Sequence, residues 1–182
     1  MKLVAGVDEV GRGCLAGPVI AAAVILRKKI PGLKDSKKLS KKKREELSLT
    51  IMQNSYFSFG SSSPKEIDKI NILQASLLAM KRAILNLSVE PGKILIDGIH
   101  KPKIKEKSYA IKHGDRFVPV ISAASIIAKV TRDKIMEEID EEFPLYNFKK
   151  HKGYPTKQHI ENIKKFGICK YHRKTSSPTS KL

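Results

Sequence analysis

The chain contains no tryptophan and only two cysteines among its 182 residues. Cys14 and Cys169 lie far apart in the sequence, so they form no metal-ligand pair, and their number suits a reducing cytosol. No apolar run is long enough to cross a membrane without a charge, and a strand is expected close to the N-terminus, which leaves no room for a signal peptide. These absences predict a cytoplasmic protein without a membrane segment.

Acidic residues are also few: the chain has 18 Asp and Glu but 36 Lys and Arg, so the formal net charge is +18. An excess of this size suggests a polyanionic partner. Residues 27–44 contain ten basic residues and one acidic residue, and residues 149–174 contain nine and one. The first run is equally consistent with a solvated surface. The second run also contains aromatic side chains that can stack on bases, so we expect it to bind nucleic acid.

The length allows one substantial core but not two comfortable domains, so we expect a single domain over residues 1–182. β-branched and aromatic content predicts strands at 3–8, 18–26, 55–60, 93–97 and, more briefly, 108–111. Helices are predicted at 40–53, 72–87, 122–140 and 156–166. The polar tail, residues 175–182, is expected to be mobile. The overall pattern is mixed α/β.

Two adjacent carboxylates follow the first apolar run of the chain. Asp8 and Glu9 come directly after Leu3–Val7, where their desolvation is costly unless a positive charge neutralises them. The next residues, Gly11-Arg12-Gly13, offer main-chain amides suited to a phosphate or a sugar. This combination indicates a divalent metal and a nucleic acid strand.

A second apolar run, residues 93–96, ends in the same way at Asp97. If the two strands are parallel neighbours, Asp8 and Asp97 emerge together at one edge of the sheet. Asp115 stands in a glycine-containing loop before a long helical stretch. Taken singly, an Asp-Gly pair after a strand is commonly a turn, and Asp115 could simply precede a helix. Together, four carboxylates without a nearby cysteine favour Mg²⁺ or Mn²⁺ over zinc.

The stretch GVDEVGRGCLAGPV, residues 6–19, closely resembles the opening of the bacterial type 2 ribonucleases H, the ribonuclease HII family. Further blocks follow in family order over nearly the whole chain: KDSKKL at 34–39, EID at 66–68 with Asn71, IDG at 96–98, GD at 114–115, SAASIIAKVTRD at 122–133 and HKGYPT at 151–156. A match of this extent is far more specific than any one short motif.

The resemblance implies the ribonuclease H-like fold: a five-stranded mixed sheet with three antiparallel strands first, helices on both faces, and a helical C-terminal extension, about residues 141–174, that closes the substrate groove. Many members carry an aromatic residue after a His-Arg-X-Ser pattern, whereas this chain continues from His172-Arg173-Lys174-Thr175 into serines. The related ribonuclease HIII enzymes are disfavoured, because they typically add an N-terminal domain and replace the arginine that is present here as Arg12.

The resemblance also implies an activity. We expect an endoribonuclease that hydrolyses the RNA strand of RNA/DNA hybrids and cuts 5′ of single ribonucleotides embedded in duplex DNA, giving 5′-phosphate and 3′-hydroxyl products. Its roles would be ribonucleotide removal from DNA and RNA primer removal. Catalysis would use two Mg²⁺ or Mn²⁺ ions about 4 Å apart. The implied metal-binding and catalytic residues are Asp8, Glu9, Asp97 and Asp115, with Asp8 as the bridging ligand.

Asp133 is an alternative to Asp115 as the fourth carboxylate. It follows Thr131-Arg132 in a helical stretch with Lys134 and Glu137, so we expect it to form a surface ion pair instead. Asp115 matches the Gly-Asp motif of the family, and we assign the site to it.

Substrate selection is expected at Gly11-Arg12-Gly13 and Tyr154. Glycines allow main-chain groups to approach a ribose, and the 2′-hydroxyl distinguishes RNA from DNA. In the family this turn reads that hydroxyl, while the tyrosine matching Tyr154 stacks on the next deoxyribose. Without the flanking motif, Tyr154 would be a half-buried aromatic in a turn. The expected phosphate contacts are Lys37, Lys38, Lys152 and Arg173.

We expect no catalytic role for the histidines. His113 lies two residues from Asp115, and the family often has another residue there, so we treat it as a neighbour of the site. His100, His151, His159 and His172 lack metal-ligand spacing and are expected in the groove or on the surface.

Two other functions remain open. A catalytically inactive RNA- or DNA-binding protein would explain the charge but would not need four convergent carboxylates. A DNA nuclease or junction resolvase with the same fold would keep the carboxylates and lose ribose selection. The substrates expected from the resemblance are RNA/DNA hybrids and ribonucleotide-containing duplex DNA. We expect a monomer, and a replication clamp is a further partner to test.

Overall fold

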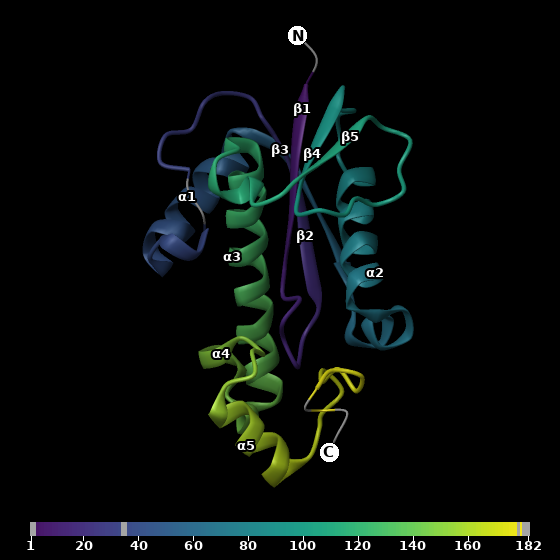
Figure 1. The fold of residues 1–182 in the computed structure, drawn as a ribbon. Helices are drawn as coiled ribbons and strands as arrows, with labels where there is room; N and C mark the ends of the chain where they lie inside the picture. Colours follow the sequence, from purple (N-terminus) through teal and green to yellow (C-terminus); the bar gives the residue numbers. More distant parts are fainter. Residues whose placement is uncertain (1–2, 34–35, 178, 180–182) are drawn as a thin grey trace.

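Five strands form one mixed sheet in the order β3-β2-β1-β4-β5 (Figure 1). The computed structural model describes residues 3–33, 36–177 and 179, and at Lys37 the main chain only. The strands are β1 (Val4–Val10), β2 (Val19–Leu26), β3 (Ser55–Ser62), β4 (Lys93–Asp97) and β5 (Ser108–Ile111). The first three are antiparallel, and β4 and β5 run parallel to β1. The predicted five-stranded mixed sheet is confirmed.

Helices cover both faces of this sheet, with α1 and α3 on one face and α2 on the other (Figure 1). The α-helices are α1 (Lys41–Gln53), α2 (Pro64–Leu85), α3 (Pro119–Glu142), α4 (Phe148–His151) and α5 (Lys157–Phe166). Three 3-10 turns accompany them: η1 (Ser36–Lys38), η2 (Gly114–Arg116) and η3 (Pro144–Tyr146). Ser40 and Thr156 are the N-caps of α1 and α5, because each side chain accepts a main-chain N–H of the first turn.

Helix α2 begins eight residues before the predicted start at residue 72. Ser63 and Glu66 form a reciprocal capping box, and Pro64 occupies the first turn. The helix is interrupted at Asn71, whose φ is 67° and whose side chain accepts the N–H of Gln74 at 3.1 Å. Asn71 therefore caps a second helical segment, and the sequence pattern had revealed only that segment.

The core lies on both sides of β2, whose residues alternate between the two faces. Ala21 and Ala23 face α2, whereas Ala22 and Val24 face α1 and α3. Helix α3 lies directly on β1, because a Cβ at Gly6 would be 2.3 Å from the main chain of Val120. This close approach brings α3 beside the carboxyl end of β1.

The C-terminal region packs below the sheet, at the end of α3 and against the connection between β1 and β2 (Figure 1). It is helical only in part, since η3, α4 and α5 are followed by a non-helical segment that returns to that connection. Ala16 and His172 form an isolated antiparallel bridge there. The expected helical extension, residues 141–174, is thus confirmed for its first part and wrong for residues 167–174.

Three histidines of this region are buried, contrary to the expectation of groove or surface positions. His151, His159 and His172 pack with Phe148 and Tyr146. The Nε2 atoms of His159 and His172 are 3.1 Å apart, and His159 Nδ1 lies 2.9 Å from the carbonyl oxygen of Tyr154. Their burial follows from mutual hydrogen bonding, which the sequence spacing does not show.

The start of the expected mobile tail is anchored to α2. Thr175 donates its main-chain N–H and its hydroxyl to Asp68 Oδ1, at 3.0 and 2.8 Å. Residues 178 and 180–182 of that tail lie outside the described residues. Across the described chain, no helix is both long and apolar enough to cross a membrane.

Candidate active site

The site lies where β1 and β4 end side by side. Their parallel pairing stops at Val7 and Ile96, so Asp8 and Asp97 follow on adjacent strands, while β1 continues to pair with β2 as far as Val10. A cleft of about 580 Å³ opens there. Its walls include all four predicted carboxylates, Asp8, Glu9, Asp97 and Asp115, together with residues 10–13, Ser36, Ser125, Lys129 and Tyr154.

Asp8 is the most buried carboxylate of the strand pair, with 6% of its surface exposed. Its Oδ1 accepts the main-chain N–H of Glu9 at 2.7 Å. Burial raises the pKa of Asp8 well above its usual range, and the nearby charges of Glu9 and Asp97 raise it further. This concentration of negative charge would be relieved by a bound cation.

Glu9 also lies in this field, and burial raises its pKa. Arg12 opposes that rise, since its Nη1 is 3.3 Å from Glu9 Oε1. The Gly-Arg-Gly turn is therefore linked electrostatically to the carboxylate cluster.

Asp115 reaches the cleft from η2, between β5 and α3. Its main-chain N–H donates to Asp97 Oδ1 at 3.2 Å, and its carbonyl oxygen accepts the Ser122 hydroxyl at 2.7 Å. The residue is 8% exposed. His113 precedes this turn with a φ of 58° and lines a neighbouring depression with Lys112, so it is a neighbour of the cleft as expected.

Asp133 lies elsewhere. Its Oδ1 is 2.8 Å from Lys129 Nζ and its Oδ2 is 3.8 Å from Arg44 Nη1. The structure thus gives Asp133 ion pairs, as expected, and brings Asp115 to the other carboxylates.

The donor set fits a hard divalent cation, because it consists of four carboxylates. Burial raises the pKa of Asp8, the most buried carboxylate of the strand pair, and the charges of Glu9 and Asp97 raise it further. No three His, Cys, Asp or Glu side chains of the described residues are already close enough together to hold an ion. All four carboxylates line one cleft.

Tyr154 stands on the wall of the same cleft that includes Gly11-Arg12-Gly13. It is 37% exposed, and its ring centroid is 5.7 Å from Lys129 Nζ and 5.9 Å from Arg132 Cζ. The exposed aromatic surface and the Lys129 ammonium on the same cleft wall fit a sugar-phosphate chain, whereas Arg132 is buried behind the ring.

The structure corrects the expectation for Arg173. This side chain is 0% exposed, and within the described residues it donates only to main-chain oxygens of residues 11, 12 and 17, so it is not available to a phosphate. Lys152 Nζ forms an ion pair with Glu137 at 2.7 Å. Lys38 is exposed on η1, and the side chain of Lys37 lies outside the described residues. Direct phosphate contacts by the lysines stay a prediction.

Sequence reasoning missed three side chains that shape the site. Ser125, Lys129 and Arg132 recur at intervals of four and three on α3, the spacing of one helix face, so their shared orientation could have been predicted. Ser125 lines the cleft and bonds to Ser36, with 3.0 Å between the hydroxyl oxygens. Arg132 is completely buried, and no local pattern signals this.

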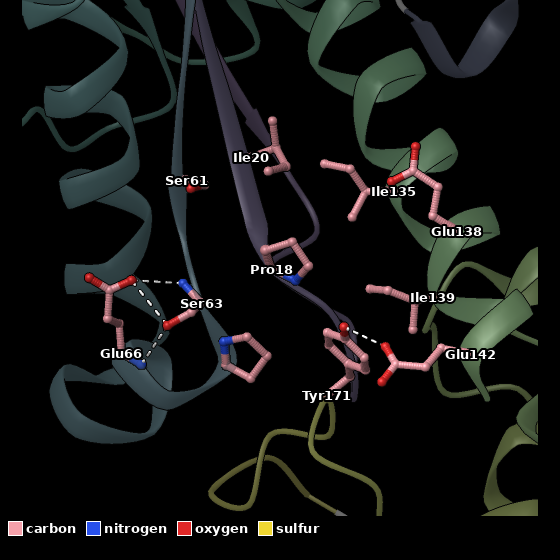
Figure 2. A pocket seen from close by; sticks show the side chains of 11 residues that line it. Pro18, Ile20, Ser61, Ser63, Glu66, Ile135, Glu138, Ile139, Glu142 and Tyr171 are labelled. Atoms are coloured by element: carbon pink, nitrogen blue, oxygen red, sulfur yellow. Dashed lines mark hydrogen bonds between the residues drawn. The ribbon is translucent and has the colours of Figure 1, made fainter.

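A second cleft, of about 480 Å³, lies between α3 and the start of α2. Figure 2 shows its apolar side chains, Ile135 and Ile139, with Glu66 and Glu142 around them. Tyr171 donates its hydroxyl to Glu142 at 2.9 Å. Glutamates repel phosphate, so this cleft does not suit a nucleic acid backbone.

Comparison with known proteins shows the family of this chain. The family model described as Ribonuclease HII matches residues 5–177. The chain belongs to the ribonuclease HII family. It is 58% identical to the ribonuclease HII of Pelagibacter ubique over 186 residues, which cover all of both chains. It is therefore an enzyme, a type 2 ribonuclease H with endonuclease activity, and this family acts on RNA/DNA hybrids with the help of divalent metal ions.

Solved structures of the same family share the fold. The ribonuclease H2 of Pyrococcus horikoshii has a TM-score of 0.81 and 29% identity over 98% of this chain and 96% of its own. The ribonuclease HII of Archaeoglobus fulgidus, solved in complex with PCNA, has a TM-score of 0.81 and 26% identity over 99% of this chain and 100% of its own. The predicted ribonuclease H-like fold is thereby confirmed.

Proposed function

We propose that this ribonuclease HII cuts the RNA strand of RNA/DNA hybrids and also cuts 5′ of single ribonucleotides in duplex DNA, leaving 5′-phosphate and 3′-hydroxyl ends. One observation carries the proposal: four carboxylates, the Gly-Arg-Gly turn and Tyr154 line the same cleft. The carboxylates provide the chemistry, and the turn with the tyrosine provides recognition of the sugar.

Asp8, Glu9, Asp97 and Asp115 would hold two Mg²⁺ or Mn²⁺ ions, with Asp8 between them. Such ions, when bound, lower the pKa of water and stabilise the leaving oxygen. Burial of Asp8 excludes bulk water from that position and strengthens its interaction with a cation. The N–H of Asp115 holds the Asp97 carboxylate in place, which fixes one ligand before the substrate arrives.

Recognition would involve main-chain groups of Gly11-Arg12-Gly13 at the 2′-hydroxyl and the ring of Tyr154 at the following deoxyribose. Tyr154 is suited to this role because its exposed ring is flanked by Lys129 and Arg132. Lys38 and Lys152, with Lys37, would bind backbone phosphates without reading sequence. The net charge of +18 favours association with a polyanion.

The whole chain, residues 1–182, would act as one catalytic domain and as a cytoplasmic monomer, in ribonucleotide removal and primer removal. The Archaeoglobus protein forms a complex with PCNA, which makes a replication clamp a candidate partner for this chain as well. Co-elution of this chain with a purified replication clamp in gel filtration tests that candidate.

One assay tests the proposed function. A duplex with a single ribonucleotide, its all-DNA twin and a continuous RNA/DNA hybrid are incubated with Mg²⁺, with Mn²⁺ and with a chelator, and products are mapped at single-nucleotide resolution. The proposal expects metal-dependent cleavage 5′ of the ribonucleotide and none of the twin. Cleavage of the twin would indicate a DNA nuclease, and binding without cleavage would indicate an inactive binding protein.

A further inference from the structure

Two buried arginines converge on the loop that joins β1 to β2. Arg132 comes from the middle of α3 and Arg173 from the C-terminal segment, and each is 0% exposed. Neither forms an ion pair within the described residues. The proposed metal chemistry does not require either of them, so their burial needs another explanation.

Arg173 binds the loop through all three nitrogens of its guanidinium. Nη1 donates to the carbonyl oxygen of Arg12 at 2.9 Å, and Nη2 donates to those of Gly11 at 2.6 Å and Gly17 at 2.9 Å. Nε donates to Gly17 as well, at 3.0 Å. One side chain thus holds both ends of the loop.

Arg132 connects the same loop to the segment that precedes Tyr154. Its Nε and Nη2 donate to the carbonyl oxygens of Pro18 at 2.9 Å and Ala16 at 3.1 Å, and its Nη1 donates to that of Lys152 at 2.9 Å. Gly11 makes room for this side chain, since a Cβ there would lie 2.2 Å from Arg132 Nε.

Burying a guanidinium without a carboxylate is costly unless its donors are satisfied. Burial lowers the pKa of Arg173 to about 10, which leaves it cationic at neutral pH. The planar, rigid fork of arginine can satisfy several fixed carbonyl oxygens at once, whereas a lysine is a flexible point charge. The arrangement therefore requires arginine for its geometry.

The direction of these carbonyl groups determines the direction of the neighbouring N–H groups. In a trans peptide, the C=O and the N–H of one unit point to opposite sides. Because the oxygens of Gly11 and Arg12 point to Arg173, the N–H groups of Arg12 and Gly13 point away from it. Residues 11–13 line the 580 Å³ cleft, and successive N–H groups can bind a hydroxyl or phosphate oxygen.

We propose that Arg173 is a positioning residue for substrate selection, which fixes the N–H donors of Arg12 and Gly13 toward the sugar at the cut site. Arg132 has the companion role of fixing the distance between that turn and Tyr154. This inference rests on the proposed function, because it concerns how the same cleft distinguishes a ribonucleotide from a deoxyribonucleotide.

The test compares Arg173→Lys with wild type by steady-state cleavage of the single-ribonucleotide duplex and by the inhibition constant of its all-DNA twin. Loss of donor alignment should lower kcat/KM about tenfold or more, as small misplacements in a site do. The inhibition constant should change less than about twofold, because phosphate contacts are unaltered. The metal concentration for half-maximal activity should stay the same.

Ile84→Val is the control, since Ile84 is buried in the core between α2 and the sheet, in a cluster that contains no residue of the loop. It should lower the melting temperature and leave kcat/KM unchanged below that temperature. The inference is overturned if folded Arg173→Lys keeps wild-type kcat/KM, or if Ile84→Val loses as much. Failure of the proposed function is a separate result, because the wild-type enzyme would then cut the all-DNA duplex.

If Arg173→Lys does not fold, Asp68→Ala takes its place. Asp68 accepts the main-chain N–H groups of Lys174 and Thr175, at 3.1 and 3.0 Å, and so anchors the segment that follows Arg173. Its removal should lower kcat/KM about two- to threefold without a change in the inhibition constant, a modest effect for one partly exposed anchor. An unchanged kcat/KM would contradict the inference.

Discussion

Asp115 donates its main-chain N–H to Oδ1 of Asp97 at 3.2 Å, so a residue of η2 holds the carboxylate at the end of β4. The contact joins two segments that are 18 residues apart and that both reach the cleft. It orients Asp97 at the cleft, which is how outer contacts generally support a metal ligand, the role proposed for Asp97.

Asp97→Asn should abolish cleavage while leaving hybrid binding intact or improved. Asparagine keeps the Oδ1 acceptor for the N–H of Asp115 but removes one negative charge from the metal site. We expect a loss of activity of about 100-fold or more, as for removal of a metal ligand. Cleavage rates in Mg²⁺ and hybrid affinity by fluorescence anisotropy give the two readouts, with Asp8→Asn measured in parallel. Retention of more than a few per cent of the activity would overturn the assignment.

Asp133→Asn should be mild in comparison with Asp115→Asn. The substitution weakens the ion pair with Lys129 on α3, and such partly exposed pairs contribute about 1 kcal/mol or less. Activity should fall less than about threefold, in line with that contribution. Side-by-side cleavage rates and thermal melting of both variants check this. If Asp115→Asn is the mild one, the two roles must be exchanged.

The position of Asp8 and Asp97 at one edge of the sheet could be predicted because it depends on short sequence patterns. An apolar run that ends in Asp8 or Asp97 is visible within a few residues, and parallel pairing then places the two strand ends together. The role of Arg173 could not be predicted in this way. Its partner Arg12 is 161 residues away, and a basic residue in a basic run gives no sign of burial.

The same limit explains the histidines and the first part of α2. His159 and His172 are buried because they hydrogen bond to each other, a tertiary pairing that spacing alone does not predict. Helix α2 was placed from its second segment because Asn71 interrupts the apolar periodicity. The family resemblance identified the motifs that belong to the site, and the structure shows which of their side chains line the cleft.

The buried histidines predict a loss of stability in acid. Cys169 N–H donates to His172 Nδ1, so His172 Nε2–H donates to His159 Nε2, and His159 Nδ1–H donates to Tyr154 O. This chain of bonds requires both rings to be neutral. Burial lowers the pKa of His159 and of His172 to about 4, against an ordinary 6.5.

Because the folded pKa values lie below the unfolded ones, the unfolded state takes up protons first as pH falls. The stabilisation is complete above pH 6.5 and is lost progressively toward pH 4. The neighbouring His151 and Lys150 add positive charge, Asp140 adds negative charge, and the Cys169 thiol lies 3.2 Å from His172. We expect a decrease of about 1 to 3 kcal/mol in the unfolding free energy, the cost of a buried uncompensated charge.

Urea unfolding at pH 7.5, 6.0 and 4.5 measures this dependence. His172→Gln should be less stable at pH 7.5 and should show a shallower decline on acidification. His100→Asn, at an exposed position, is the control and should follow wild type. Identical pH profiles for wild type and His172→Gln would show that other groups cause the acid sensitivity.

The ring of Tyr154 tests recognition apart from chemistry. If it stacks on the deoxyribose that follows the ribonucleotide, Tyr154→Ala should lose about 1 to 3 kcal/mol of productive binding, by analogy with base stacking. The ring of Tyr154 lies beside Lys129 and Arg132, and its removal changes none of the four carboxylates. The metal requirement should therefore be unchanged. Tyr154→Phe keeps the ring and should be nearly silent.

The loss should be largest for a single ribonucleotide in DNA, where only one RNA-to-DNA step is present, and smaller for a continuous RNA strand paired with DNA. Both cleavage rates are measured at one salt concentration, because phosphate contacts depend on salt. Equal losses on the two substrates would mean that Tyr154 supports the groove without reading the junction. Selection of the sugar would then depend on Gly11-Arg12-Gly13 and on the arginine that holds its carbonyl groups.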